Sequence, residues 1–138
     1  MHGSCVARDG DAILLVGAPG SGKSDLVLRL LARGFDLIAD DQVDIADGFA
    51  SCPAELAGLL EARGIGIVRL PYRPRARVAL VLDLGRTADR IPSSARHPRL
   101  DVPVIAIDAA AASAPERVAL ALDCALGHVP QVAGAFAA

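Results

Sequence analysis

The stretch Ala12-Ile13-Leu14-Leu15-Val16-Gly17-Ala18-Pro19-Gly20-Ser21-Gly22-Lys23-Ser24 decides the fold of this chain. Its five apolar residues, 12–16, predict a buried strand, which the glycine-rich segment then ends. From Ser24 to Arg33 the apolar residues 26, 27, 30 and 31 share one helical face, and Gly34 is placed to close that helix as a C-cap. The order strand, glycine loop, helix indicates an α/β fold.

The segment Gly17–Ser24 matches the pattern G-x-x-x-x-G-K-[ST] of phosphate-binding loops in full. Its glycines allow successive backbone N–H groups to point at a phosphate, and the helix N-terminus adds positive potential. The motif predicts that Gly17, Ala18, Pro19, Gly20, Ser21, Gly22, Lys23 and Ser24 bind a nucleotide, with Lys23 bridging its β- and γ-phosphates and Ser24 ligating Mg²⁺. Every one of the 14 basic residues except Lys23 is arginine. A chance glycine-rich turn is the alternative, and the motif alone does not separate a kinase from a GTPase, an ATPase or a passive nucleotide sensor.

The rest of the chain adds mostly strands. Asp-Gly pairs at 9–10 and 47–48 predict two hairpins, and residues 35–39 predict a strand that ends on Asp40-Asp41. Further strands are expected at 76–84 and 102–107, a short helix or turn at 53–60, and a closing helix at 115–126. The glycines at 64 and 66 interrupt a strand-like run and predict a close backbone approach. We therefore expect a single domain over 1–138, with a mixed sheet, flanking helices and a loose tail from 127 to 138.

Composition excludes several classes of protein. With 138 residues, 53% of them hydrophobic, the chain has room for one domain and its core. A net charge of -2 and 3% aromatic residues disfavour nucleic-acid binding. No apolar run approaches the ~20 residues of a membrane span, and the N-terminus lacks a signal-peptide pattern, so we expect a cytoplasmic protein. The three cysteines, Cys5, Cys52 and Cys124, are far apart, which favours reduced thiols over disulfides or a zinc site.

Asp40-Asp41 is the main candidate for chemistry outside the loop. Carboxylates at a strand end beside a phosphate loop can accept a proton or hold a metal ion. Solvated turn residues are the alternative. His2, Glu61 and Arg90 carry weak signals by themselves, typical of a chain terminus, a surface helix end and a solvated charge.

Taken together, these motifs resemble the catalytic domain of HPr kinase/phosphorylase, over roughly His2 to Leu126. The matching segments, in the family's order, are His2-Gly3, Gly17–Ser24, Leu37-Ile38-Ala39-Asp40-Asp41, Leu60-Glu61-Ala62-Arg63-Gly64-Ile65-Gly66-Ile67 and Asp89-Arg90-Ile91. The resemblance implies an ATP- and Mg²⁺-dependent kinase that phosphorylates a serine of the phosphocarrier HPr. It also implies a homo-oligomer, a hexamer in the family, and a short form or excised domain without the family's N-terminal domain.

The resemblance also implies roles for single residues. One aspartate of the pair, with Asp41 favoured over Asp40, would take the proton of the serine, and Glu61 would complete the Mg²⁺ site with Ser24. His2 and Arg90 would lie near the transferred phosphoryl group, Arg90 toward a neighbouring subunit. The family's basic Pro-Val-Arg-Pro-Gly-Arg segment, tied to its dephosphorylating reaction, has no match in 99–103. Two other interpretations stay open: a small-metabolite kinase with an arginine-rich lid at 86–99, and a nucleotide-sensing module without activity.

Overall fold

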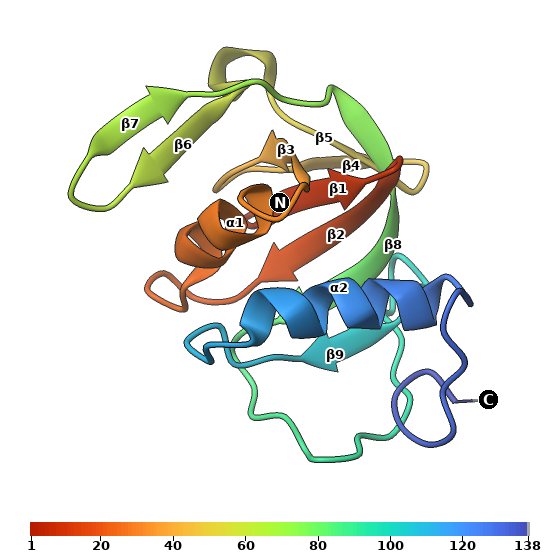
Figure 1. The fold of residues 1–138 in the computed structure, drawn as a ribbon. Helices are drawn as coiled ribbons and strands as arrows, with labels where there is room; N and C mark the ends of the chain where they lie inside the picture. Colours follow the sequence, from red (N-terminus) through yellow and green to blue (C-terminus); the bar gives the residue numbers. More distant parts are fainter. Residues whose placement is uncertain (138) are drawn as a thin grey trace.

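A seven-stranded mixed sheet is the framework of residues 1–137, which are the residues that this computed structural model describes (Figure 1). Its strands are β1 (Ser4–Arg8), β2 (Asp11–Val16), β3 (Asp36–Ala39), β4 (Asp44–Ala46), β5 (Phe49–Ser51), β8 (Arg75–Asp83) and β9 (Val104–Ala106). A separate hairpin consists of β6 (Leu59–Ala62) and β7 (Gly66–Arg69), and the helices are α1 (Lys23–Leu31) and α2 (Ala114–Ala125). The mixed α/β architecture expected from the sequence is confirmed.

Strand β2, which leads into the glycine loop, lies in the interior of this sheet. The strand order is β3-β1-β2-β8-β5-β4, and β9 also pairs with β8. The pairs β2–β8 and β8–β9 are parallel, and the remaining pairs are antiparallel. Both Asp-Gly hairpins form where predicted, and at the first of them Asp9 and Gly10 both have positive φ, as a tight two-residue turn requires.

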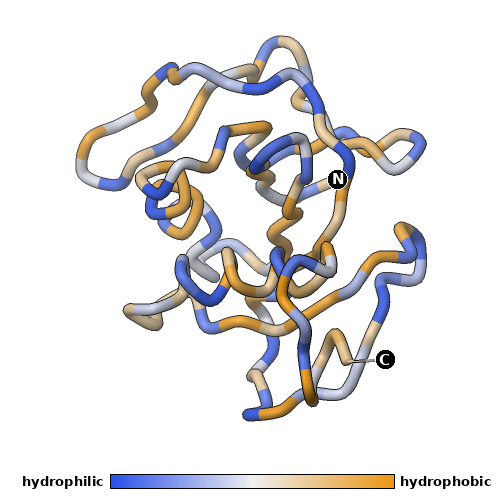
Figure 2. Tube along the Cα trace, turned by 45° about the vertical axis from the view of Figure 1, so that its right-hand side comes forward, coloured by the Kyte–Doolittle hydropathy of each residue, from blue (hydrophilic) through white to orange (hydrophobic). Residues whose placement is uncertain are grey.

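The core has two parts, one on each face of the sheet. Helices α1 and α2 lie side by side on one face (Figure 1), where α1 packs mainly against β1 and β6 and α2 packs against β8. The cluster on the other face contains residues of β1, β3, β5 and β8. Figure 2 shows the hydrophobic stretches in the middle of the molecule and mixed hydropathy along the outer loops. Two ion pairs hold the helices in place: Arg8 of β1 with Asp123 of α2, and Arg33 with Glu116 at 2.9 Å.

Helix α1 ends at Leu31 with Ala32 as its C-cap, earlier than the predicted end at Arg33 with Gly34 as the C-cap. Gly34 has φ of 90°, and the amide of Phe35 donates to the carbonyl of Leu30 at 3.2 Å. A left-handed glycine of this kind satisfies the last carbonyls of a helix. The chain then turns directly into β3, which brings Asp40 and Asp41 to the end of a strand two places from β2.

The prediction of a close backbone approach at Gly64 and Gly66 is wrong. These glycines lie in and after the turn between β6 and β7, and a Cβ at either position would meet nothing within 4 Å. Their φ values of 83° and 125° give the reason for glycine here, because the turn needs left-handed backbone. The short helix or turn expected at 53–60 is a single 3-10 turn, Ala54–Leu56, after which β6 begins.

The C-terminal segment contacts the body of the protein. The sequence predicts a loose tail from residue 127. In the structure, however, Ala135 is only 7% exposed and Phe136 packs against the core cluster on the helix side of the sheet. The amide of Phe136 donates to Oε1 of Gln131 at 2.6 Å. Among the helices that the structure describes, none is long and apolar enough to cross a membrane.

Candidate functional site

The loop Gly17–Ser24 connects the end of β2 to the start of α1, so the predicted strand, loop and helix order is confirmed. Two of its glycines are required by the structure. A Cβ on Gly17 would lie 2.6 Å from Oγ of Ser21, and Gly22, the N-cap of α1, has φ of 94°. No side chain caps this helix end, which leaves the first-turn N–H groups facing the loop and open to an anion.

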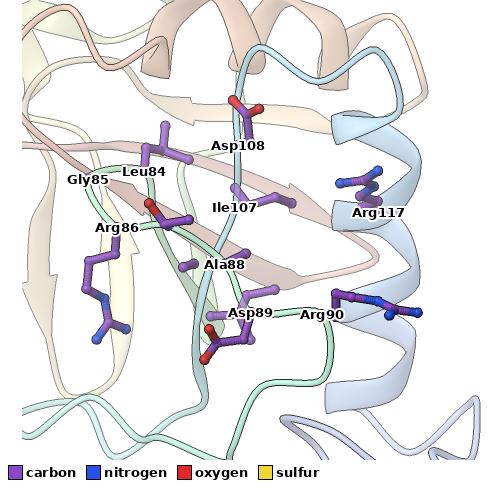
Figure 3. Close-up of a pocket in the computed structure, with 12 residues that line it drawn as sticks. Leu84, Gly85, Arg86, Ala88, Asp89, Arg90, Ile107, Asp108 and Arg117 are labelled. Atoms are coloured by element: carbon purple, nitrogen blue, oxygen red, sulfur yellow. The ribbon is translucent and has the colours of Figure 1, made fainter.

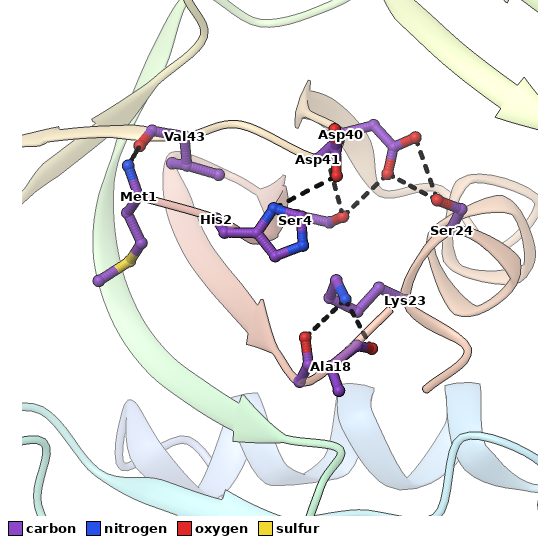
Figure 4. A network of polar contacts seen from close by, with 10 residues as sticks. Met1, His2, Ser4, Ala18, Lys23, Ser24, Asp40, Asp41 and Val43 are labelled. Atoms are coloured by element: carbon purple, nitrogen blue, oxygen red, sulfur yellow. Dashed lines mark hydrogen bonds and ion pairs between the residues drawn. The ribbon is translucent and has the colours of Figure 1, made fainter. Parts of the chain in front are cut away.

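Lys23 is buried in the loop without a carboxylate partner. Its side chain is 7% exposed, and Nζ donates to the carbonyl oxygens of Gly17 at 2.7 Å and Ala18 at 3.2 Å (Figure 4). None of the ion pairs within residues 1–137 includes Lys23. A buried ammonium is costly unless an opposite charge balances it. The hydroxyl of Ser21 is also buried and has no hydrogen-bond partner in the described structure. Both groups fit a phosphate chain in this loop.

Asp40 faces inward from the end of β3 and joins two serine hydroxyls. Ser24 Oγ donates to Oδ1 of Asp40 at 2.9 Å, and Ser4 Oγ donates to the same oxygen at 2.8 Å (Figure 4). Hydroxyl and carboxylate oxygens are ligands that Mg²⁺ prefers, usually one or two of them together with substrate phosphates and water. Ser24 and Asp40 therefore fit a Mg²⁺ ion shared with a nucleotide. Among the described residues no group of three or more His, Cys, Asp or Glu could hold a metal ion on its own.

Asp41 faces outward beside His2. Its side chain is 69% exposed, and its Oδ1 lies 3.4 Å from Nδ1 of His2. The φ of 73° at Asp41 turns the two neighbouring carboxylates in different directions. The pair therefore divides into an inner carboxylate bonded to Ser24 and an outer carboxylate that a large molecule can reach.

The N-terminal residues position this cluster. Met1 and Val43 exchange backbone hydrogen bonds at 3.0 and 2.9 Å, and the amide of Gly3 donates to the carbonyl of Asp41 at 3.1 Å. Ser4, fully buried, also accepts a 3.4 Å hydrogen bond from the amide of Asp41. Sequence reasoning missed Ser4. The available signal was a hydroxyl at the start of an otherwise apolar strand, because a buried polar side chain needs a partner.

Glu61 makes no hydrogen bond or ion pair with the cluster of His2, Lys23, Ser24, Asp40 and Asp41 among the described residues. It is exposed on β6 between the buried Leu60 and Ala62, so strand alternation turns it away from the core. None of the hydrogen bonds within the described residues joins it to Ser24. Its role as a metal ligand stays a prediction.

Arg90 also lies outside the cluster, at a cavity of about 850 Å³ (Figure 3). Loops that follow β8 and β9 form this cavity together with α2, and the side chains that line it include Leu84, Arg86, Arg90, Ile107, Asp108 and Arg117. In this set sequence reasoning named Arg90, from the family resemblance, and Arg86, as the start of a candidate arginine-rich lid at 86–99. The others carry no motif, because loops from distant parts of the chain bring them together.

The cysteines are free, as predicted, and two of them are unsuited to act as nucleophiles. Burial raises the pKa of the Cys5 thiol well above its ordinary value. Burial raises the pKa of the Cys52 thiol as well, with further contributions from the nearby carboxylates of Asp44, Glu55 and Asp40. Both thiols therefore stay protonated at neutral pH, and the thiolate is the reactive form.

Comparisons with known proteins agree with the motifs. A sequence model of the family described as "HPr Serine kinase C-terminal domain" matches residues 1–84. The HPr kinase/phosphorylase of Cupriavidus necator is 36% identical over 118 residues, which are 74% of this chain and 36% of that protein. The HPr kinase/phosphorylase of Clostridium tetani is 43% identical over 75 residues, which are 51% of this chain and 25% of that protein. The matched segments thus span only a quarter to about a third of these relatives.

A solved structure shows the same fold. The Hpr(Ser) kinase/phosphatase from Coxiella burnetii superposes with a TM-score of 0.73 at 22% sequence identity, over 93% of this chain and 91% of that one.

Proposed function

Because the chain belongs to the HPr serine kinase C-terminal domain family, we propose that it is an ATP- and Mg²⁺-dependent kinase that phosphorylates a serine of the phosphocarrier HPr. One observation carries the proposal: a buried Lys23 with no carboxylate partner in the described residues lies in a glycine loop beside the Ser24–Asp40 contact. This arrangement suits a nucleotide whose phosphates supply the missing negative charge. Relatives named HPr kinase/phosphorylase support HPr as the acceptor.

The two aspartates take different parts in this proposal. Asp41 is exposed, so the hydroxyl of a protein substrate can reach it, and it accepts the serine proton as the serine oxygen bonds to the γ-phosphorus and ADP leaves. His2, 3.4 Å away, orients Asp41. Asp40 holds the hydroxyl of Ser24 and stays on the metal side. When bound, Mg²⁺ would neutralise part of the negative charge on the phosphates.

Further parts of the proposal rest on the family resemblance alone. These are the contribution of Glu61 to the Mg²⁺ site, the approach of Arg90 to the transferred group from a neighbouring subunit, and assembly into a hexamer. The reverse reaction, in which inorganic phosphate attacks phosphoserine, pyrophosphate forms and Asp41 returns its proton to the serine oxygen, is not included in the proposal, because the family's basic segment tied to it has no match in 99–103.

The test is transfer of phosphate from labelled ATP to purified HPr, with and without Mg²⁺, followed by identification of the labelled residue. We expect phosphoserine in the presence of Mg²⁺ and none with Lys23→Ala, because the loop then lacks its ammonium. Subsequent addition of inorganic phosphate tests the reverse reaction, with labelled pyrophosphate as its product. Bound ATP without labelled HPr would overturn the kinase proposal in favour of a nucleotide-sensing module or a kinase of small metabolites.

A further inference from the structure

The glycine loop lies between the acidic pair Asp40-Asp41 on one side and the 850 Å³ cavity on the other. On one side β2 pairs with β1 and β1 with β3, whose end carries Asp40 and Asp41. On the other side β2 pairs with β8 and β8 with β9, and the residues that follow these two strands form the 850 Å³ cavity. The three strands β2, β8 and β9 are parallel, so their carboxyl ends meet at one edge of the sheet. In α/β sheets, ligands bind at this edge.

The cavity begins directly beside the loop. The amide of Leu84 donates to the carbonyl of Val16 at 2.9 Å, and a Cβ at Gly17 would lie 3.3 Å from Cβ of Leu84. A Cβ at Gly22 would lie 3.1 Å from Cβ of Ala109, the residue that follows Asp108. No chain segment therefore separates the two ends of the loop from the walls of the cavity.

We propose that this cavity binds the nucleoside, that is the base and ribose, of the nucleotide whose phosphates lie in the loop. The inference rests on the proposed function, because it takes the transferred γ-phosphate to lie at the Asp40–Asp41 side. A triphosphate extended along the loop from that side places its α-phosphate, and hence its ribose, toward β8 and β9. A volume of about 850 Å³ is within the range of small-molecule sites.

The lining of the cavity suits a base and a sugar. Leu84 and Ile107 offer apolar surface, and Arg117 projects from α2 beside it (Figure 3). A guanidinium plane stacks well on an aromatic ring. Asp108, whose Oδ1 accepts the amide of Ala110 at 3.0 Å, holds a second carboxylate oxygen for a ribose hydroxyl. Arg86 is already paired with Asp83 at 3.0 Å, whereas Arg117 has no ion pair among the described residues.

Helix α1 also holds the segment that directly follows Asp108 of the cavity lining. Its Arg29 donates through Nη1 and Nη2 to the carbonyl of Ala109, with a 3.3 Å contact from Nη1 to the carbonyl of Ala111. The same helix thus begins at the loop and holds, through Arg29, the segment next to Asp108. All of the lining residues except Leu84 follow the segment that the family model matches, and of these only Asp89 and Arg90 belong to a motif that the sequence analysis named.

The test compares two ligands that share a phosphate chain. Binding of ATP and of inorganic tripolyphosphate is measured by calorimetric titration with Mg²⁺ and without HPr, for the full chain and its variants. Arg117→Ala should weaken ATP about tenfold, the scale of a lost guanidinium–ring contact, and leave tripolyphosphate unchanged. Ala88→Trp, at an exposed position of the lining, should give the same selective loss by obstructing the cavity. Arg77→Ala, at the opposite end of β8, is the matched control and should change neither affinity.

Either of two results would overturn the inference: both variants bind ATP as the wild type does, or both lose ATP and tripolyphosphate equally. A wild-type protein that binds neither ligand would overturn it together with the proposed function. Selective loss of ATP in a protein that transfers no phosphate to HPr would instead leave this site standing and remove the kinase proposal.

Discussion

Replacing Ser4 by alanine tests the central contact of the candidate site. Ser4 is fully buried, and its hydroxyl donates to Asp40 at 2.8 Å and accepts from the amide of Asp41 at 3.4 Å. A hydrogen bond to a charged group contributes about 1.5–3 kcal/mol to stability. Asp40 is only half-buried and keeps its bond to Ser24, and the 3.4 Å contact is long. We therefore expect Ser4→Ala to lower the free energy of unfolding by about 1–2 kcal/mol, at or just below the lower end of that range.

Urea unfolding of the ligand-free protein measures this change directly, since it gives the midpoint and slope of a two-state transition. Ser51→Ala is a suitable control, because Ser51 also lies in a strand of the sheet but makes no side-chain hydrogen bond among the described residues. Its unfolding free energy should stay within about 0.5 kcal/mol of the wild type. A loss for Ser4→Ala no larger than that of Ser51→Ala would refute the idea that Ser4 holds the acidic pair in place.

Three further substitutions test other parts of the structure. Gly17→Ala puts a Cβ 2.6 Å from Oγ of Ser21, so the loop must shift, and overpacking of this kind costs about 1–3 kcal/mol of stability. Calorimetric titration should therefore show the affinity for ATP reduced at least about tenfold. An affinity equal to that of the wild type would contradict the loop geometry. Lys23→Met keeps the apolar stem of the side chain and removes its charge. ATP at 100 times its dissociation constant stabilises a protein by about 2.7 kcal/mol, and this stabilisation should disappear when the variant is unfolded in urea with Mg²⁺. A variant that ATP still stabilises would show that Lys23 does not hold the phosphates. Burial raises the pKa of the Cys5 thiol above its ordinary 9.0, so above that pH the unfolded thiol loses its proton while the folded one keeps it. The free energy of unfolding should then fall by up to about 1.4 kcal/mol per pH unit. Unfolding of Cys5→Ala, measured from pH 8 to 10.5, should show a flatter slope, and an unchanged slope would refute burial of Cys5 as the cause.

Features that depend on neighbouring residues could be predicted from the sequence. The Asp-Gly hairpins, the left-handed Gly34 after α1 and the loop between β2 and α1 are each encoded within a few residues. The position of Asp40-Asp41 at the end of β3 follows from the same local pattern. Their approach to Ser24 depends on the order of strands in the sheet, which places β3 two strands from β2 and which no local pattern encodes.

Features that depend on distant contacts could not be predicted. Ser4 meets Asp40 across 36 positions of sequence, and nothing in the segment 4–8 shows which strand will pair beside it. The cavity is formed by loops after β8 and β9 and by α2. From the sequence alone, the arginines of these segments cannot be distinguished from ordinary solvated surface charges. The glycines of the β6–β7 hairpin were misinterpreted because the same residue serves both close approach and left-handed turns.

The most direct test of the account is the effect of Asp41→Asn on phosphate transfer to HPr and on ATP binding, measured on the same preparation. The amide keeps the size of the side chain and cannot accept the serine proton. The account predicts that the rate of phosphoserine formation falls by a factor of about 10² or more, the scale of general base catalysis, while the dissociation constant for ATP with Mg²⁺ stays near that of the wild type. Transfer at the wild-type rate would contradict the assignment of Asp41 as the base.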